Sequence, residues 1–460
     1  MRIDNKPVVT NVVFLFASIL FVLIFLNPVL GKEYIVREGR PKAEIIISRH
    51  PPRMVKLAAV ELQAYVEKIT GARLPITQTP GTALPVKIYV GRSAHTDQLK
   101  ITDEGLNYGA FRMVSGDNQL VLLGRDKDFV PIEPWAPTRQ DLARVLVEWD
   151  ALTGHKWSYP YGGLMRSYNS TLGLWEHDAG GSLQAVYEFL RSLGVRWYFP
   201  GDLGEIVPQT KNIALPKVDK VVHPDFAVRD MIVMYQHVSP EDLMWRRRLG
   251  LNSGHELMGL GPQGHGINPM HSRPEVKAAH PEYLAIWGGK RTDNKPCLSA
   301  EGLLQDNIAY ARFLFDHYNA PMVNVSPNDG YGQLCECELC AGKDTPERGP
   351  DGRLSDYVWG YVNRVATELY KTHPDRLVSG LAYTSYLLPP EKIEQFSPNV
   401  AVVFVRWRSS YTDPKTKTRE LHLRQDWLER LPSKSLFLWS EYAHGRPRGW
   451  YSRIPVYYPR

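Results

Sequence analysis

The sequence has little net charge, few cysteines and no long basic run. Among its 460 residues, 55 are Lys or Arg and 49 are Asp or Glu, and no stretch holds five consecutive basic residues. The surplus of +6 gives no support to a nucleic-acid-binding function. Hydrophobic residues make up 43% and charged residues 23% of the chain, a balance that excludes a largely disordered protein. We therefore expect two or three folded domains that bind no nucleic acid.

Several catalytic motifs are also missing. There is no G-x-S-x-G elbow, which argues against an α/β-hydrolase. H-E-x-x-H is absent because position 259 is Gly, so a zincin is excluded. No glycine-rich phosphate loop follows the first predicted strand of the second half, which disfavours a doubly wound nucleotide-binding sheet. We expect no cofactor and no catalytic metal. A metal-dependent enzyme that uses His255, Glu256 and His265 is an open alternative.

The N-terminus has the pattern of a targeting segment. Arg2 and Lys6 precede an apolar run from Val12 to Leu26. This run is shorter than the about 20 residues that span a bilayer, and Asn27 and Pro28 end it. Small residues then offer a cleavage site, so residues 1–31 are predicted to be a signal peptide. An uncleaved anchor is the alternative and would be the chain's only contact with a membrane. The protein is expected to be exported, to the periplasm or the extracellular space.

Three of the four cysteines, Cys335, Cys337 and Cys340, form a C-x-C-x-x-C motif, and the fourth, Cys297, lies upstream. In an exported protein such cysteines favour disulfides. The C-x-C-x-x-C spacing also suits four thiolates around a zinc ion. Both interpretations stay open, with disulfides slightly favoured by an oxidising compartment. In either case the four side chains should converge and act as a structural staple rather than in catalysis.

Residues 32–222 read as one α/β domain. A β-branched strand at 43–47 precedes apolar residues at helical spacing from Met54 to Ile69, and Thr70-Gly71 ends this helix. A hairpin is predicted around Ser115-Gly116-Asp117-Asn118. The apolar positions of the strands, such as Ile45 and Ile88, should form one sheet with the 54–69 helix packed on one face.

Residues 223–460 alternate strands and helices. Strands are predicted at 227–235, 251–258, 282–287, 321–327, 376–383, 399–406 and 434–441, and helices at 241–249, 299–318, 354–372 and 417–430. Such alternation predicts a parallel sheet, and this length favours a (β/α)₈ TIM-like barrel, which takes about 250 residues. No pattern for an eighth strand appears before Arg460, so the barrel is expected to be truncated. The fold class is therefore α/β, with an accessory α/β domain in front of an incomplete barrel.

Parts of the sequence resemble known families. Residues 58–76 and 180–201 resemble the non-catalytic N-terminal domain of bacterial α-glucuronidases and β-hexosaminidases. Residues 280–283, 289–291, 326–330 and 335–340 resemble a family of exported bacterial proteins that carry domain of unknown function 4838. The first resemblance implies that a catalytic TIM barrel follows the accessory domain. It also implies glycoside hydrolysis as the class of activity, with an acidic residue after the fourth strand commonly the proton donor.

Two carboxylates are the candidate catalytic residues. Catalytic groups of TIM barrels lie at the carboxyl ends of the strands. Asp329 follows the fourth predicted strand and Glu441 follows the seventh, next to Trp439. Glycoside cleavage needs two such groups, separated by about 6.5–9.5 Å in inverting enzymes. The α-glucuronidase resemblance favours inversion, so we expect this range. A turn-capping Asp329 and a rim Glu441 paired with arginine are the structural alternatives.

Other polar and aromatic side chains near the predicted strand ends are candidates for binding a sugar. These residues are His255, His265, Asn328, Tyr383, Arg406 and Trp439. Arg406 suits a uronate carboxylate, because a guanidinium binds carboxylates with two hydrogen bonds. His265 lies between two glycines that permit close approach of a ligand.

These observations predict an exported glycoside hydrolase-like enzyme that acts on a poly- or oligosaccharide, with uronate-bearing chains as a candidate substrate. Its partner would be a carbohydrate. A non-catalytic glycan-binding protein on the same scaffold is the alternative, since a fold does not fix a function.

Overall fold

The structure is a computed structural model that describes residues 33–136, 139–160, 168–231, 239–259, 264–407 and 411–441. The side chains of Arg139, Trp407 and Glu441 also lie outside this description, as does the predicted signal peptide. Within the described residues, no helix has both the length and the apolar character needed to cross a membrane.

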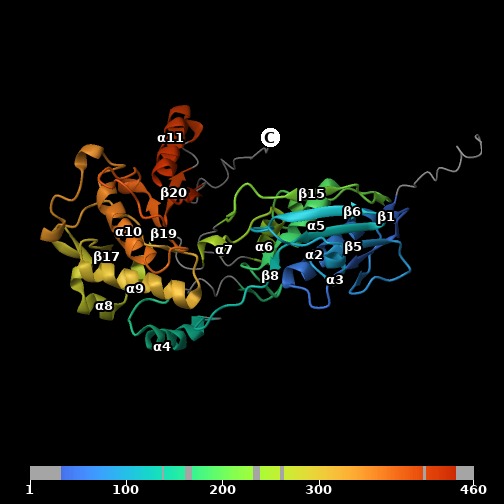
Figure 1. Cartoon of the computed structure of the whole chain (residues 1–460), viewed down its shortest axis with the longest axis horizontal. Coiled ribbons are helices and arrows are strands. Elements are labelled where there is room, and N and C mark those ends of the chain that lie inside the picture. The colour runs from blue at the N-terminus through green and yellow to red at the C-terminus, as the bar shows by residue number, and fades with distance from the viewer. Residues whose placement is uncertain are drawn as a thin grey trace, which may run out of the picture. The chain divides into compact units, whose positions relative to one another are not determined.

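The chain divides into two compact units (Figure 1). The first contains residues 33–127 and 179–224, and the second contains residues 128–178 and 225–441. The segment 128–178, predicted to belong to the accessory domain, thus packs with the second unit. Asp150 in this segment forms a bidentate ion pair with Arg273, at 2.5 and 3.1 Å. The Trp149 side chain is fully buried and meets Tyr310 edge to face.

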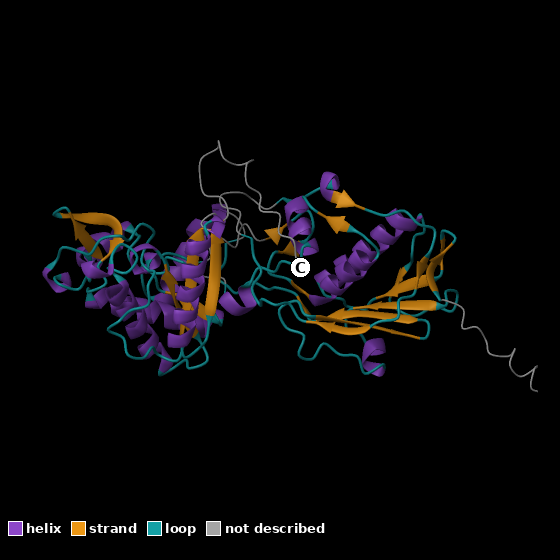
Figure 2. Cartoon of the chain, turned by 90° about the horizontal axis from the view of Figure 1, so that it is seen from above, coloured by secondary structure: helices purple, strands orange, loops and turns teal. Residues whose placement is uncertain are grey.

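The first unit is built around a six-stranded sheet with the order β15-β6-β7-β5-β3-β4. Its elements are β1 (Tyr34–Arg37), β2 (Arg40–Pro41), β3 (Ala43–Ile46), α2 (Arg53–Thr70), β4 (Ile76–Thr77), β5 (Val86–Val90), α3 (Ala94–Gln98), β6 (Phe111–Gly116), β7 (Gln119–Gly124), β8 (Asp126–Lys127), β11 (Ala179–Gly180), α5 (Gly181–Ser192), β12 (Arg196–Trp197), β13 (Glu205–Ile206), β14 (Ile213–Ala214) and β15 (Asp219–Val222). Helices α2 and α5 pack against each other and against this sheet (Figure 2).

The helix, strand and hairpin predictions for this unit are confirmed. Helix α2 follows the apolar spacing and ends at Gly71, whose φ of 78° is left-handed and whose N–H donates to Glu67 at 2.8 Å. Ile45 pairs with Ile88 in the parallel β3–β5 ladder, and both side chains are fully buried. The predicted hairpin is β6–β7, with Asn118 at a φ of 58° in its turn.

The second unit contains a four-stranded parallel sheet with the order β18-β19-β20-β21. Its elements are α4 (Leu142–Thr153), β9 (Tyr168–Asn169), β10 (Leu174–Trp175), α6 (Pro240–Arg248), α7 (His255–Met258), α8 (Pro274–Ala279), β16 (Leu284–Trp287), β17 (Lys290–Pro296), α9 (Glu301–Tyr318), β18 (Met322–Asn324), α10 (Ser355–Tyr370), β19 (Leu377–Ala382), β20 (Val400–Trp407), α11 (Pro414–Arg430) and β21 (Leu436–Glu441), with short 3₁₀ turns between them. The last four strands and the helices α6, α9, α10 and α11 match their predicted positions.

The barrel prediction is only partly met: the fold is mixed α/β, and the described residues form no closed barrel. The predicted strand 251–258 is a loop followed by helix α7, because Gly254 takes a left-handed φ of 66° and opens the helix. The predicted strand 282–287 contains β16, which pairs antiparallel with β17. Gly288 and Gly289, at φ of 59° and 71°, make the two-residue turn that forces this hairpin. Part of the predicted strand 227–235 lies outside the described residues.

Candidate functional site

The carboxyl end of strand β18 is held by the side chain of Asn324, which is only 2% exposed. Its amide nitrogen donates to Ser379 in β19 at 3.1 Å. Its amide oxygen accepts from the N–H groups of Ser326, at 3.0 Å, and Gly266, at 3.3 Å. One buried amide thus fastens β18, the neighbouring strand and the 264–266 loop together. The sequence interpretation missed this role, although a polar residue inside an apolar strand was the available signal.

The loop Gly264–Gly266 touches strands from both edges of the sheet. A Cβ at position 266 would lie 1.6 Å from the backbone oxygen of Asn324 in β18. A Cβ at position 264 would lie 3.1 Å from the indole of Trp439 in β21 and 3.3 Å from Leu381 in β19. Two residues span at most about 7 Å of chain. The Trp439 side chain of one edge strand and the backbone of the other therefore converge on one short loop. Position 266 requires glycine, and a side chain at position 264 would press on Trp439 and Leu381.

His265 is presented between these glycines in a fixed orientation. Its backbone has a left-handed φ of 56°. Its Nδ1 lies 2.7 Å from the carbonyl oxygen of Pro327, and because a carbonyl can only accept, Nδ1 carries the proton. In the neutral ring Nε2 is then an acceptor, and it makes no hydrogen bond within the described part of the chain. The ring faces Tyr383 edge to face, with 6.4 Å between centroids.

The loop after β18 places Asn328 and Asp329 differently. Asn328 is 8% exposed, and its amide donates to Asn268 at 3.0 Å. It also lies next to His271, whose pKa is lowered to about 4 by burial. Asp329 is exposed, and its Oδ1 accepts from the N–H of Gly330 at 2.8 Å. Lys295 of β17 donates to the backbone oxygen of Asp329. This leaves Oδ2 of Asp329 without a hydrogen bond in the described residues.

A surface pocket of about 650 Å³ opens near the same strand ends. Its wall includes residues that directly follow Tyr383 and residues just beyond Asp329. The lining residues are Gly332, Pro346, Gly349, Pro350, Asp351, Arg353, Thr384 and Ser385. The hydroxyl of Ser385 donates to the backbone oxygen of Tyr331 at 3.0 Å, which ties the two loops together. None of the described candidate site residues lines this pocket, and its link to them is that Thr384 directly follows Tyr383 in the chain.

Three other candidates, Arg406, Glu441 and His255, are not part of this group. The Arg406 Nε forms a 2.6 Å ion pair with Glu420 of α11, whose side chain is 1% exposed. This pair fastens β20 to α11, so we leave Arg406 out of the sugar contacts. The backbone of Glu441 ends β21 opposite Trp407, while its side chain lies outside the described residues.

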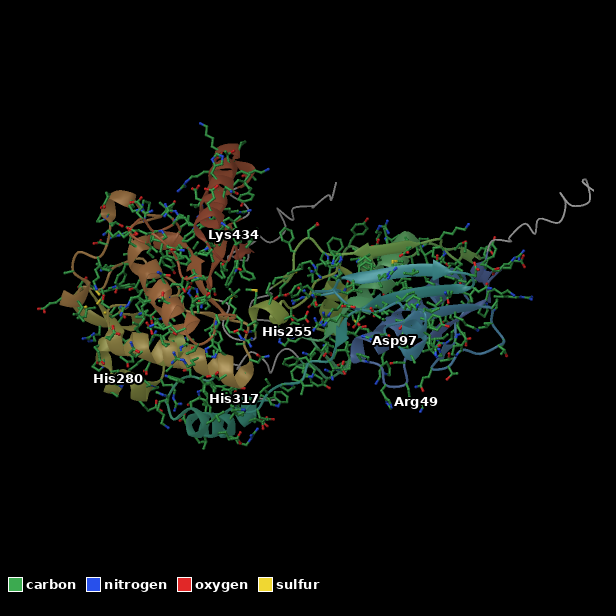
Figure 3. The ribbon with its side chains drawn as sticks, in the orientation of Figure 1. Arg49, Asp97, His255, His280, His317 and Lys434 are labelled. Carbon is green, nitrogen blue, oxygen red and sulfur yellow. The ribbon has the colours of Figure 1, made fainter. Side chains whose placement is uncertain are left out.

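His255 begins α7 (Figure 3). It belongs to a second cluster of aromatic rings. Its ring centroid lies 5.1 Å from that of His177 and 5.6 Å from that of Phe129. Burial and the proximity of His255 lower the pKa of His177 to about 3, so His177 is neutral at pH 7. Helix α7 ends beside the amino end of β18, where Gly259 meets Pro321, whereas His265 lies at the carboxyl end. In the described residues, the only group with metal-ligand geometry is the cysteine cluster, so a metal site at His255 and His265 finds no support.

The comparisons with known proteins give distant structural similarities. The comparison with curated proteins gives no match. The chain is similar to "A novel family GH115 4-O-Methyl-alpha-glucuronidase, BtGH115A, with specificity for decorated arabinogalactans", at 13% identity and a TM-score of 0.39, over 88% of this chain and 54% of that one. It is also similar to a "GH138 enzyme targeting pectin rhamnogalacturonan II", at 8% identity and a TM-score of 0.27, over 86% of this chain and 46% of that one. The chain spans about half the length of these proteins.

A family model described as "Domain of unknown function (DUF4838)" matches residues 199–442. The match covers more than half of the chain and includes β16 to β21, with the Gly264–Gly266 loop, the Asn328–Asp329 loop and all four cysteines. The family resemblance noted in the sequence is thereby confirmed, and the chain belongs to the DUF4838 family.

Proposed function

We propose that the protein is an exported, glycan-active protein of the glycoside hydrolase type, with its site at the carboxyl ends of β18 to β21. The observation that carries this proposal is the Gly264–Gly266 loop, which contacts Asn324 of β18 and Trp439 of β21. The loop gathers His265, Tyr383 and Trp439 beside the Asn328–Asp329 turn. Ligands of parallel α/β sheets bind at this end of the strands.

The chemical character of the group suits a sugar. Aromatic side chains such as Tyr383 and Trp439 provide flat apolar surfaces with a polar edge, which match the faces of a pyranose ring. The acceptor nitrogen of His265 can bind a hydroxyl group, while the buried amide of Asn328 donates to Asn268 and supports the loop. The pocket beside Thr384 and Ser385 has space for part of an oligosaccharide.

For hydrolysis we assign the two carboxylates to Asp329 and Glu441. The N–H of Gly330 holds one oxygen of Asp329, which orients the other oxygen outward. One carboxyl would protonate the leaving oxygen while the other activates water, with the two groups about 6.5–9.5 Å apart. A screen of aryl-glycosides and uronate-capped oligosaccharides would identify the sugar and its linkage. It would also show whether the substrate is acidic or neutral.

A second candidate function is glycan binding without catalysis. It is favoured by the local hydrogen bond of Asp329, because one oxygen of this carboxylate is already used to hold the backbone N–H of Gly330 in the turn. A binding protein would keep His265, Tyr383 and Trp439 and need no second carboxylate.

The deciding experiment measures both turnover and binding on the full chain. Asp329→Asn and Glu441→Gln should each lower kcat by orders of magnitude and leave the melting temperature and Kd nearly unchanged. Asp117→Asn, at the exposed turn of the β6–β7 hairpin, is the matched control. Binding without turnover in the wild type, with Kd weakened by Trp439→Ala, would establish the glycan-binding alternative instead. Neither turnover nor binding of any glycan would refute both.

A further inference from the structure

The four cysteine sulfurs gather at one point. Cys297 Sγ lies 3.6 Å from Cys340 Sγ and 3.7 Å from Cys337 Sγ, and the latter two are 3.5 Å apart. With Cys335 included, all four sulfurs lie within 4.8 Å of one another. None of the four is in a disulfide. The expected convergence of the cysteines is therefore confirmed.

These distances match a tetrahedral metal site rather than disulfides. Four sulfurs that surround zinc at about 2.3 Å stand about 3.8 Å apart along the edges of a tetrahedron. A disulfide brings two sulfurs to about 2.05 Å and excludes a third from equal contact. Here Cys297, Cys337 and Cys340 form a nearly equilateral triangle, with the fourth sulfur within reach of all three.

The surroundings of the cluster favour thiolates. Cys297, Cys335 and Cys340 are at most 2% exposed, and the N–H of Ile286 donates to Cys335 Sγ at 3.3 Å. The hydroxyl of Tyr357 lies 3.1 Å from Cys340 Sγ. The thiolate is the form of cysteine that binds a metal, and hydrogen-bond donors beside a buried sulfur suit it.

We propose that Cys297, Cys335, Cys337 and Cys340 bind one Zn²⁺ ion as a structural site. With four protein ligands the ion has no open position for a substrate, so its role is to hold the chain. Cys297 directly follows β17, and the other three ligands lie on the loop that continues from the Asn328–Asp329 turn.

Further contacts show what the ion would fasten. The Glu336 carboxylate, between two ligands, accepts from the N–H groups of Gly288 and Gly289 at 2.8 Å each. The Glu336 N–H donates to Ile286 at 2.9 Å. The loop that carries Cys335, Cys337 and Cys340 is therefore hydrogen-bonded both to strand β16 and to the turn of the β16–β17 hairpin. Since Lys295 of β17 also binds the backbone of Asp329, the ion would fix the turn that follows β18.

The test uses the full chain purified under reducing conditions and analysed by metal mass spectrometry. We expect one zinc ion per chain, loss of the ion in a strong chelator, and a lower melting temperature after that loss. Replacement by Co²⁺ should give the intense visible bands of a tetrahedral thiolate complex. Cys337→Ser, at the least buried ligand, should lower zinc occupancy severalfold, and Ser299→Ala, beside the cluster but without a ligand atom, should retain the ion.

Two results would overturn the proposal. One is a folded chain with four reduced thiols and no bound metal after supply of zinc. The other is an intact mass that shows two disulfides in the folded protein and the same melting temperature with and without chelator. Because the wild-type stoichiometry and the cobalt spectrum need no mutation, the test holds even where a cysteine variant fails to fold. None of these readouts depends on glycan activity.

Discussion

The backbone oxygen of Asn324 lies so close to Gly266 that no side-chain carbon fits between them: a Cβ at position 266 would be 1.6 Å from that oxygen. The same asparagine accepts the Gly266 N–H through its side chain. A backbone contact and a side-chain contact thus fix one loop on one strand. The orientation of His265 in the candidate site follows from this double attachment.

Gly266→Ala tests the contact directly. The methyl group has to displace the loop or strand β18, and we expect a loss of about 3 kcal/mol in the free energy of unfolding. Glycan binding should weaken as well, because His265 moves with the loop. Gly360→Ala is the control: nothing lies within 4 Å of its Cβ position in helix α10, so this change should be neutral or slightly stabilising. Equal melting temperatures for the two variants would contradict the packing.

Asn324→Leu removes the acceptor of two backbone N–H groups, those of Ser326 and Gly266. Each buried donor without a partner costs about 1–3 kcal/mol, so the variant should lose about 2–6 kcal/mol of stability. Ser379→Ala removes the acceptor of one side-chain N–H only and should cost less. Chemical denaturation of both variants gives the comparison, and a larger loss for Ser379→Ala would speak against the central role of Asn324.

The pH dependence of stability should reflect His271. Burial lowers its folded-state pKa to about 4, below the unfolded value of about 6.5. The stabilisation is therefore complete above pH 6.5 and is lost as the pH falls toward 4, by up to about 3 kcal/mol. Urea midpoints at pH 7.5 and pH 4.5 should differ less for His271→Gln than for the wild type. An unchanged difference would show that other groups dominate in this range.

The Arg406–Glu420 pair should matter for stability and not for glycan affinity. Arg406→Met leaves a carboxylate that is 1% exposed without its 2.6 Å partner, and we expect a loss of about 3 kcal/mol. Adding Glu420→Leu should restore part of that loss, since the buried carboxylate that had lost its ion pair with Arg406 is then gone. Calorimetric titration with an oligosaccharide that the protein binds tests the expected lack of effect on glycan affinity. A large increase in Kd for Arg406→Met would show that Arg406 contacts the glycan.

Much of the fold could be predicted because its local signals are strong. The helices 54–69 and 354–372 combine apolar periodicity with clear ends, and the last four strands are apolar runs between turn residues. The predicted strand 251–258 is wrong for a local reason, since Gly254 takes a left-handed backbone conformation that starts a helix. The predicted strand 282–287 exists as β16, but the left-handed Gly288 and Gly289 turn it into an antiparallel hairpin instead of a parallel barrel strand.

The candidate site was harder to predict because it depends on contacts distant in sequence. His265, Asn328 and Tyr383 could be chosen from their positions after predicted strands. That Arg406 would meet Glu420, or that His255 would meet His177, depends on how helices and loops pack. The convergence of the cysteines was predictable from their spacing, whereas the nearly equal sulfur distances that distinguish a metal from disulfides needed coordinates.

The division of the chain into interleaved segments has a consequence for its synthesis. The six-stranded sheet needs β15 at residues 219–222, so the first unit is complete only when the ribosome has passed the whole segment 128–178. That segment carries Trp149 and Asp150, whose partners Tyr310 and Arg273 are made later. A nascent chain of intermediate length can therefore complete the first unit while its segment 128–178 still lacks the residues of the second unit against which it packs. This interval is where a chaperone would bind, and where a fragment ending near residue 222 would aggregate.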